Sequence, residues 1–250
     1  MIILHTPACQ EHPDAKTMVV FIHGFMGSPN QFIDLAAAAY ENSCSYVSVL
    51  LPGHGVHAKE FMKSAASDWE RHVQNEIESI KDRYEKIFLV GHSMGGLIAL
   101  NVSLDKENKI AGIFMISTPL KLRWFHYQSL FAKLRLLTYP RSNEVKSAYL
   151  KSNSIAGCSL IYYPLFVKPF MSFYQLVRKT KNCLAEVFVP VYIVHSKNDE
   201  TTSYKSAKLL YDGLCNAQRT AVTLDKSWHA FFTEQERRII SETLNNLIAI

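Results

Sequence analysis

The chain lacks the sequence features that mark several large classes of protein. No apolar run approaches the roughly 18 residues that a membrane-spanning helix needs, and no basic segment leads into a long apolar run after Met1. We therefore expect neither a transmembrane helix nor a signal peptide. The composition is not that of a disordered, collagenous or repeat protein either. These absences predict a globular protein of the cytoplasm.

Cysteine is scarce, and its spacing excludes two kinds of site. The five cysteines are odd in number, widely scattered and free of any CxxC pair: Cys9, Cys44, Cys158, Cys183 and Cys215. This pattern favours reduced thiols over a disulfide framework or a metal site. His54 and His57 share a glycine-rich turn, but no third ligand follows at a suitable spacing. We predict turn and cap contacts for these two histidines, and no metal or other cofactor.

Acidic residues are nearly absent from one segment of the chain. Residues 120–185 carry eleven Lys or Arg and a single acid, Glu144, which leaves 16 of the 27 basic and 21 of the 22 acidic residues for the rest. The segment is therefore strongly positive, whereas the remainder is weakly negative. Such asymmetry within one chain points to a part with its own role.

Outside this segment, short apolar runs alternate with amphipathic stretches. We expect strands at 2–4, 18–22, 46–50, 87–90, 110–117, 189–195 and 220–224, and helices at 64–83, 94–104, 204–214 and 234–248. Such alternation predicts an α/β fold, with a mainly parallel sheet covered by helices on both faces. Residues 1–119 and 186–250 form the predicted core. Residues 120–185, with helical stretches around 124–137 and 170–181, form a predicted helical lid over the carboxyl ends of the strands.

One stretch carries the strongest chemical signal. The apolar run 87–90 leads into Gly91-His92-Ser93-Met94-Gly95, which matches G-x-S-x-G, and a helical pattern follows. In the order strand, tight turn, helix, this motif places a strained serine at the carboxyl end of a sheet, with its hydroxyl exposed for attack. We therefore predict that Ser93 is a nucleophile, although the bare motif also occurs in glycine-rich turns without chemistry.

A serine nucleophile needs a base and an acid that orients the base. In this architecture the order along the chain is serine, acid, histidine. His229 lies in the loop after the last strand, and Asp199 follows the strand before it. We predict both as catalytic, with Glu200 as the second candidate for the acid and Asp225 as a weaker one.

Backbone N–H groups complete the predicted site by stabilising the oxyanion. One donor is expected to be the N–H of Met94, at the start of the helix after the nucleophile. The other is expected to be the N–H of Phe25, in the loop after the first strong strand. The side chain of Phe25 is also predicted to wall the acyl pocket.

Together these motifs resemble the α/β-hydrolase superfamily, and within it the bacterial carboxylesterase and monoacylglycerol lipase group. The resemblance covers residues 18–118 and 187–248 and rests on HGFMGS, LPGHG, Asp68-Trp69, GHSMGG, Asp199 and His229. It implies an α/β-hydrolase fold, a serine esterase with a small lid, an acyl-enzyme intermediate and no cofactor. The sequence departs from the group at Trp228, where glycine is frequent, and this change would either narrow the pocket or press on the imidazole of His229.

The predicted lid is rich in aromatic as well as basic residues. One interpretation is a hydrophobic acyl pocket to which Trp124 and Trp228 contribute. The outer face of the lid would then be basic and would contact anionic lipid surfaces transiently. The alternative is that the aromatic rings pack on the core while the lysines are solvated. No recognised nucleic-acid module is present, so nucleic acid is not a predicted partner.

The predicted function is hydrolysis of carboxylic esters, either short to medium acyl esters or monoacylglycerols, through an acyl-Ser93 intermediate. The partner is thus a small acyl ester. Two alternatives remain open: the same three residues acting on thioesters, amides or carbon–carbon bonds, and a non-catalytic ligand-binding protein on the same fold. The sequence makes no prediction of oligomeric state.

Overall fold

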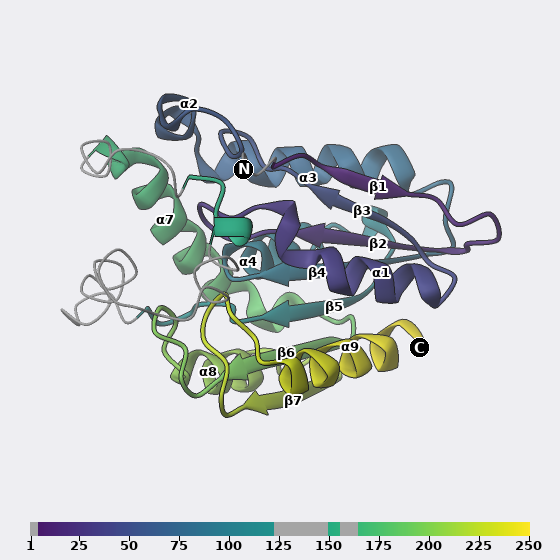
Figure 1. The fold of residues 1–250 in the computed structure, drawn as a ribbon. Helices are drawn as coiled ribbons and strands as arrows, with labels where there is room; N and C mark the ends of the chain where they lie inside the picture. Colours follow the sequence, from purple (N-terminus) through teal and green to yellow (C-terminus); the bar gives the residue numbers. More distant parts are fainter. Residues whose placement is uncertain (1–4, 123–149, 156–164) are drawn as a thin grey trace.

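A single mainly parallel sheet organises the chain. The computed structural model describes residues 5–122, 150–155 and 165–250, and these contain seven strands in the order β1-β3-β2-β4-β5-β6-β7 (Figure 1). Every neighbouring pair is parallel except β1 with β3. The strands are β1 (Ala8–Gln10), β2 (Thr17–Ile22), β3 (Ser45–Val49), β4 (Lys86–His92), β5 (Ile110–Ile116), β6 (Val191–Ser196) and β7 (Arg219–Leu224).

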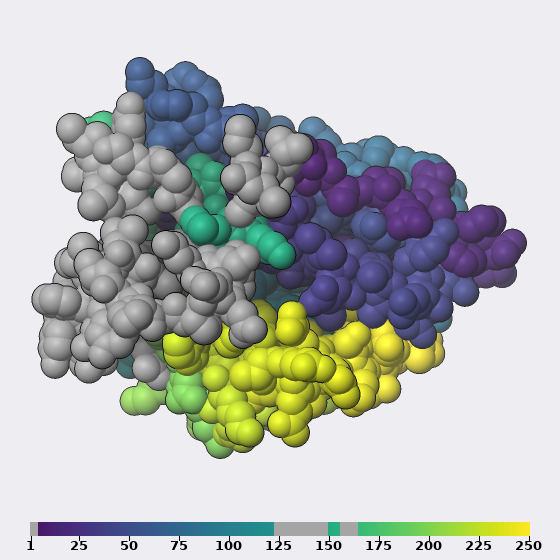
Figure 2. Space-filling view, viewed as in Figure 1, coloured from purple at the N-terminus to yellow at the C-terminus, as the bar shows by residue number. Residues whose placement is uncertain are grey.

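Helices cover both faces of this sheet, as predicted. The helices α1 (Ile33–Glu41) and α9 (Glu234–Ile248) lie side by side on one face, as the purple-blue and yellow surfaces of Figure 2 show. The other face carries α3 (Ala66–Ile80), α4 (Met94–Val102), α7 (Val167–Cys183) and α8 (Lys205–Gly213) (Figure 1). Shorter elements are α2 (Ala58–Lys63) and the 3-10 turns η1 (Pro29–Phe32), η2 (Lys106–Asn108) and η4 (Leu184–Glu186).

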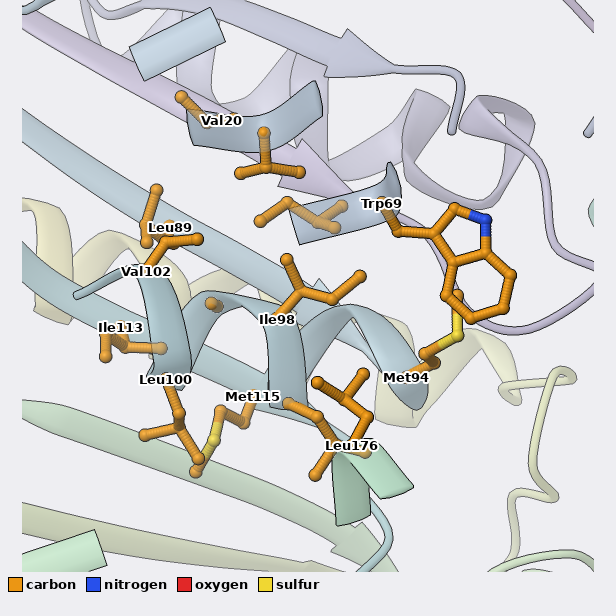
Figure 3. Close-up of a cluster of buried hydrophobic side chains, with 14 of the residues drawn as sticks. Val20, Trp69, Leu89, Met94, Ile98, Leu100, Val102, Ile113, Met115 and Leu176 are labelled. Carbon is orange, nitrogen blue, oxygen red and sulfur yellow. The ribbon is translucent and has the colours of Figure 1, made fainter. Parts of the chain in front are cut away.

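Helix α4 is the most deeply buried helix of this core. All nine of its residues are buried, because it packs on β4 and β5 from one side and contacts α3 and α7 on the others. Figure 3 shows Met94, Ile98 and Val102 of this helix among apolar side chains from the sheet, α3 and α7. The helix that follows Ser93 is therefore held rigidly from all sides.

The region before β4 differs in detail from the prediction. The predicted helix over 64–83 is present as the shorter α3, and a short helix that was not predicted, α2, precedes it across an extended link at Ser64 and Ala65. The carboxylate of Asp68 accepts the N–H of Ala65 at 3.0 Å, so it caps the start of α3. The apolar side chains that recur at helical spacing in α3 are buried, as predicted: Trp69, Val73 and Ile77. An edge strand exists as β1, whereas the predicted strand 2–4 lies outside the described residues.

Part of the predicted lid is packed on the core. Helix α7, which is longer than the predicted 170–181, contacts α2, α3 and α4 and buries Phe173, Leu176 and Val177. The predicted helix around 124–137 lies outside the described residues. In the described part of the chain, no helix is both long and apolar enough to cross a membrane.

Candidate active site

Ser93 occupies the turn between β4 and α4 in a strained backbone conformation. Its φ is 53° and its ψ is −118°, in the left-handed half of the map that non-glycine residues rarely enter. The turn is held because the N–H of Ser93 donates to the carbonyl of Ile116 at 2.8 Å. A Cβ atom on Gly91 would lie 2.4 Å from the carbonyl carbon of Gly95, so only glycine allows strand and helix to approach this closely.

The three residues predicted to act together lie in one hydrogen-bonded chain. His229 Nε2 is 3.0 Å from the Oγ of Ser93, and His229 Nδ1 is 2.8 Å from Asp199 Oδ2. Asp199 is fully buried, and its Oδ1 accepts the N–H groups of Thr201 (2.8 Å) and Thr202 (2.6 Å). The sheet brings these residues together because β4 and β6, on either side of β5, end at the same edge.

Asp199 stays ionised despite its burial. Burial by itself would raise the pKa of this carboxyl, but His229 and the N–H donors of Thr201 and Thr202 outweigh it, and the pKa lies below its usual value. The carboxylate can therefore accept a hydrogen bond from the protonated Nδ1 of His229. This bond directs Nε2 of the same ring toward Ser93. The carboxylate would also stabilise the imidazolium when His229 is protonated.

The other two candidate acids contact different groups. Glu200 Oε2 accepts the main-chain N–H of His229 at 2.9 Å, and Asp225 forms an ion pair at 2.7 Å with Lys197 at the surface. Asp199 is thus the carboxylate that bonds the imidazole ring. Sequence order alone could not separate two adjacent acids, since either could follow the end of the strand.

Phe25 lies in the loop after β2, at the carboxyl end of that strand. The N–H groups on either side of it are satisfied, that of Gly24 by Gln31 Oε1 at 3.3 Å and that of Met26 by His54 Nε2 at 3.1 Å. Within the described residues, no acceptor takes the N–H of Phe25. Met94 is the first residue of α4, so its N–H has no partner inside the helix.

Two buried histidines fix this loop. His54 donates from Nδ1 to the carbonyls of Leu51 and Pro52, both at 3.2 Å, while His23 Nε2 accepts the N–H of Leu51 at 3.0 Å. Burial lowers the pKa of His54 to about 4, and that of His23 falls well below its usual value. Both rings are therefore neutral near neutral pH. The imidazole of His57 caps α2 through the N–H of Lys59, so the two turn histidines make the predicted contacts.

The loop that carries His229 is anchored to α9 and β6. The Glu236 carboxylate accepts the N–H groups of Asp225 (2.7 Å) and Lys226 (2.9 Å) and the hydroxyl of Ser227. Ser196 donates to the carbonyl of Ser227. Burial opposes ionisation of Glu236, but these donors hold its pKa below the usual value. The sequence gives no signal for this anchor, because an acid in the first turn of a helix is ordinary.

The residues predicted to line the substrate pocket lie in different surroundings. The ring of Phe25 packs among Phe61, Trp69, Phe170 and Phe173, with centroid distances of 5.2 to 6.2 Å. The half-buried ring of Trp228 lies 6.1 Å from that of Phe231. Trp124 lies outside the described residues. Phe25 thus sits in an aromatic cluster that joins α2, α3 and α7.

A separate cavity of about 90 Å³ touches the far side of the site. It lies between η1, α1 and α9, and its walls include His92, Ile116 and Phe232. Among the described residues, Ser93 and His229 do not line it. Its link to the site is therefore His92, whose ring centroid lies 4.9 Å from that of His229.

Comparison with known proteins agrees with this architecture. Solved structures with the same fold include one of the metagenome-derived lipolytic enzymes LipS and LipT (TM-score 0.78, 20% identity, all of both chains) and a monoacylglycerol lipase of Paleococcus ferrophilus (TM-score 0.72, 18% identity, 97% of this chain and 98% of that one). The fold is that of the α/β hydrolases, which confirms the predicted fold class.

Sequence comparison then gives the family. A family model described as serine aminopeptidase, S33, matches residues 13–236, and the chain belongs to this family. It is 24% identical over 228 residues to a thermostable monoacylglycerol lipase of Bacillus sp. strain H-257, covering 90% of this chain and 87% of the relative. It is 22% identical over 227 residues to a carboxylesterase of Bacillus subtilis, covering 90% and 89%. The predicted resemblance is confirmed.

Proposed function

We propose that the chain hydrolyses carboxylic esters, either short to medium acyl esters or monoacylglycerols, through an acyl-Ser93 intermediate. The observation that carries this proposal is the chain of hydrogen bonds from Asp199 through His229 to Ser93, with distances of 2.8 and 3.0 Å. The names of the two Bacillus relatives support an ester substrate over the alternatives of thioester, amide or carbon–carbon bond.

The reaction follows from this geometry in two halves. His229 Nε2 takes the proton of Ser93 as Oγ attacks the carbonyl carbon, and the N–H groups of Phe25 and Met94 stabilise the resulting oxyanion. Collapse of this intermediate breaks the ester C–O bond, and His229 gives its proton to the leaving alcohol. Water then attacks the acyl-enzyme with His229 as base, which releases the carboxylic acid and restores Ser93.

Hydrolysis of a series of p-nitrophenyl esters from acetate to palmitate, together with a monoacylglycerol, tests this function. We expect kcat/KM to peak at one chain length, because an acyl pocket of finite size accommodates chains only up to its own length. Labelling by a fluorophosphonate, mapped to Ser93 by mass spectrometry, serves as the control for an active nucleophile. Labelled protein that cleaves aminoacyl p-nitroanilides and no ester would contradict the proposal and favour the amide alternative.

We also propose that residues 120–185 act as a lid that contacts anionic lipid surfaces transiently, in a protein of the cytoplasm. The support lies on α7, where Val167, Met171 and Tyr174 are exposed at helical spacing with two basic residues, Arg178 and Lys181. Apolar and basic side chains on one helix face suit an anionic interface. Free thiols at Cys9, Cys44, Cys183 and Cys215 support a reducing compartment.

Binding to vesicles tests the lipid contact. We expect the chain to sediment with vesicles that contain phosphatidylglycerol and to stay in solution with pure phosphatidylcholine, and added salt should release it because surface charges are screened. The double variant Arg178→Gln, Lys181→Gln should bind several-fold more weakly. Equal binding to both kinds of vesicle would contradict a charge-driven contact.

A further inference from the structure

The main chain of His229 is held on both sides by side chains. Its N–H donates to Glu200 Oε2 at 2.9 Å, and its carbonyl oxygen accepts from His92 Nε2 at 2.8 Å. Neither bond involves the imidazole, whose two nitrogens face Asp199 and Ser93. Four separate contacts thus fix one loop residue, two on its ring and two on its peptide groups.

The two residues that hold the peptide groups come from rigid parts of the fold. His92 is the last residue of β4, immediately before Ser93, and only 4% of its surface is exposed. Glu200 follows Asp199, which the N–H groups of Thr201 and Thr202 fix in place. Because each of these residues adjoins one partner of the His229 ring, a shift of the loop would strain both contacts at once.

The two residues differ in charge. Burial, with a contribution from neighbouring His229, lowers the pKa of His92 to about 3, so its ring is neutral and donates from Nε2. Its Nδ1 is buried and has no hydrogen-bond partner among the described residues. Glu200 is half-buried and accepts an N–H as a carboxylate. One contact is therefore neutral, and the other brings a negative charge next to His229.

We infer that Glu200 and His92 are positioning residues that hold His229 in the correct place relative to Ser93. Glu200 also stabilises the protonated imidazole of His229. This inference rests on the ester hydrolysis proposed above. A near-attack geometry tolerates little displacement, so loss of either contact lowers the rate of the chemical step more than it changes substrate binding.

The electrostatic part can be worked out from the groups that face His229. They are Asp199 on the ring, Glu200 on the N–H, and the neutral rings of His92 and His195. A carboxylate favours the imidazolium, so removing the charge of Glu200 lets the neutral base persist to lower pH. The acid limb of the profile of kcat/KM against pH must then move to lower pH.

Paired variants separate the hydrogen bond from the charge. Glu200→Gln keeps an acceptor but no charge, and we expect kcat within about threefold of the parent chain and an acid limb at lower pH. Glu200→Ala removes both and should lower kcat about tenfold, with KM within about twofold. His92→Phe should also lower kcat about tenfold without moving the acid limb, and His92→Gln, which retains a donor, should recover most of the loss.

Asp225→Asn is the matched charge control, since it removes a carboxylate that pairs with Lys197 at the other end of the same loop. It should leave both kcat and the acid limb in place. An unmoved acid limb in Glu200→Gln, or an unchanged kcat in Glu200→Ala, overturns the inference. If the ester proposal itself fails, the parent chain cleaves no ester. The pH dependence of fluorophosphonate labelling of Ser93 then measures the shift of the acid limb between the parent chain and Glu200→Gln without any substrate.

Discussion

Replacing Ser93 with alanine is expected to lower kcat for ester hydrolysis about a million-fold. The variant has no oxygen 3.0 Å from His229 Nε2, so no acyl-enzyme forms and water must attack the substrate directly. The donors of Phe25 and Met94 would still stabilise an oxyanion, so a residual rate of about 10³ to 10⁴ over water should remain. Initial rates on the best p-nitrophenyl ester measure both values.

Ser117→Ala is the matched control for this loss. Ser117 follows the neighbouring strand β5, shares the positive φ of 53°, and has a buried hydroxyl without a partner among the described residues. It therefore undergoes the same chemical change at a residue with the same φ. Both variants should melt within a few degrees of the parent chain, and Ser117→Ala should keep its kcat. Appreciable ester hydrolysis by Ser93→Ala would rule out the acyl-serine route.

Gly95→Ala should be the most damaging change to the fold. A Cβ atom at this position would lie 1.8 Å from the carbonyl oxygen of Ile22 and 2.9 Å from that of His23, which are main-chain atoms that cannot rotate away. Helix α4 must then separate from the end of β2. We expect a loss of more than about 4 kcal/mol in the free energy of unfolding, measured by urea denaturation.

Gly213→Ala gives the comparison for this effect. A Cβ atom there would meet Leu184 Cδ1 at 2.5 Å, but that atom is the far end of a flexible side chain and not a main-chain atom. Alanine also favours the helix over glycine by about 1 kcal/mol. The stability of this variant should stay within about 1 kcal/mol of the parent chain. Equal stability losses for Gly95→Ala and Gly213→Ala would show that the contact with the main chain of Ile22 is unimportant.

Much of the fold could be predicted because its signals are local. The apolar run before Ser93, the glycines around it and the helical pattern after it determine a strand, a turn and a helix within about 20 residues. The order of Ser93, Asp199 and His229 along the chain then follows from the alternation of strands and helices. Their predicted juxtaposition agrees with the hydrogen-bond distances of the structure.

What could not be predicted depends on contacts between distant segments. Glu200 and Asp199 are equivalent by sequence, and only the path of the loop sends one to the main chain of His229 and the other to its ring. The short helix α2 was not predicted, because its six residues are too few for a helical pattern to be recognised. Helix α7 looked like part of a separate lid because its composition is basic, yet its Leu176 and Val177 complete the core beside α4.

The buried histidines are expected to lower the stability of the folded protein in acid. His54, His92 and His195 have pKa values of about 4, 3 and 4 while the chain is folded, against 6.5 when it is exposed. Unfolding therefore takes up protons once the pH falls below about 6.5. As the pH falls further toward 4, the equilibrium shifts toward the unfolded chain. The rings of His54 and His92, which bond the loops of Phe25 and His229, thus make the folded state less stable as the pH falls from about 6.5 toward 4.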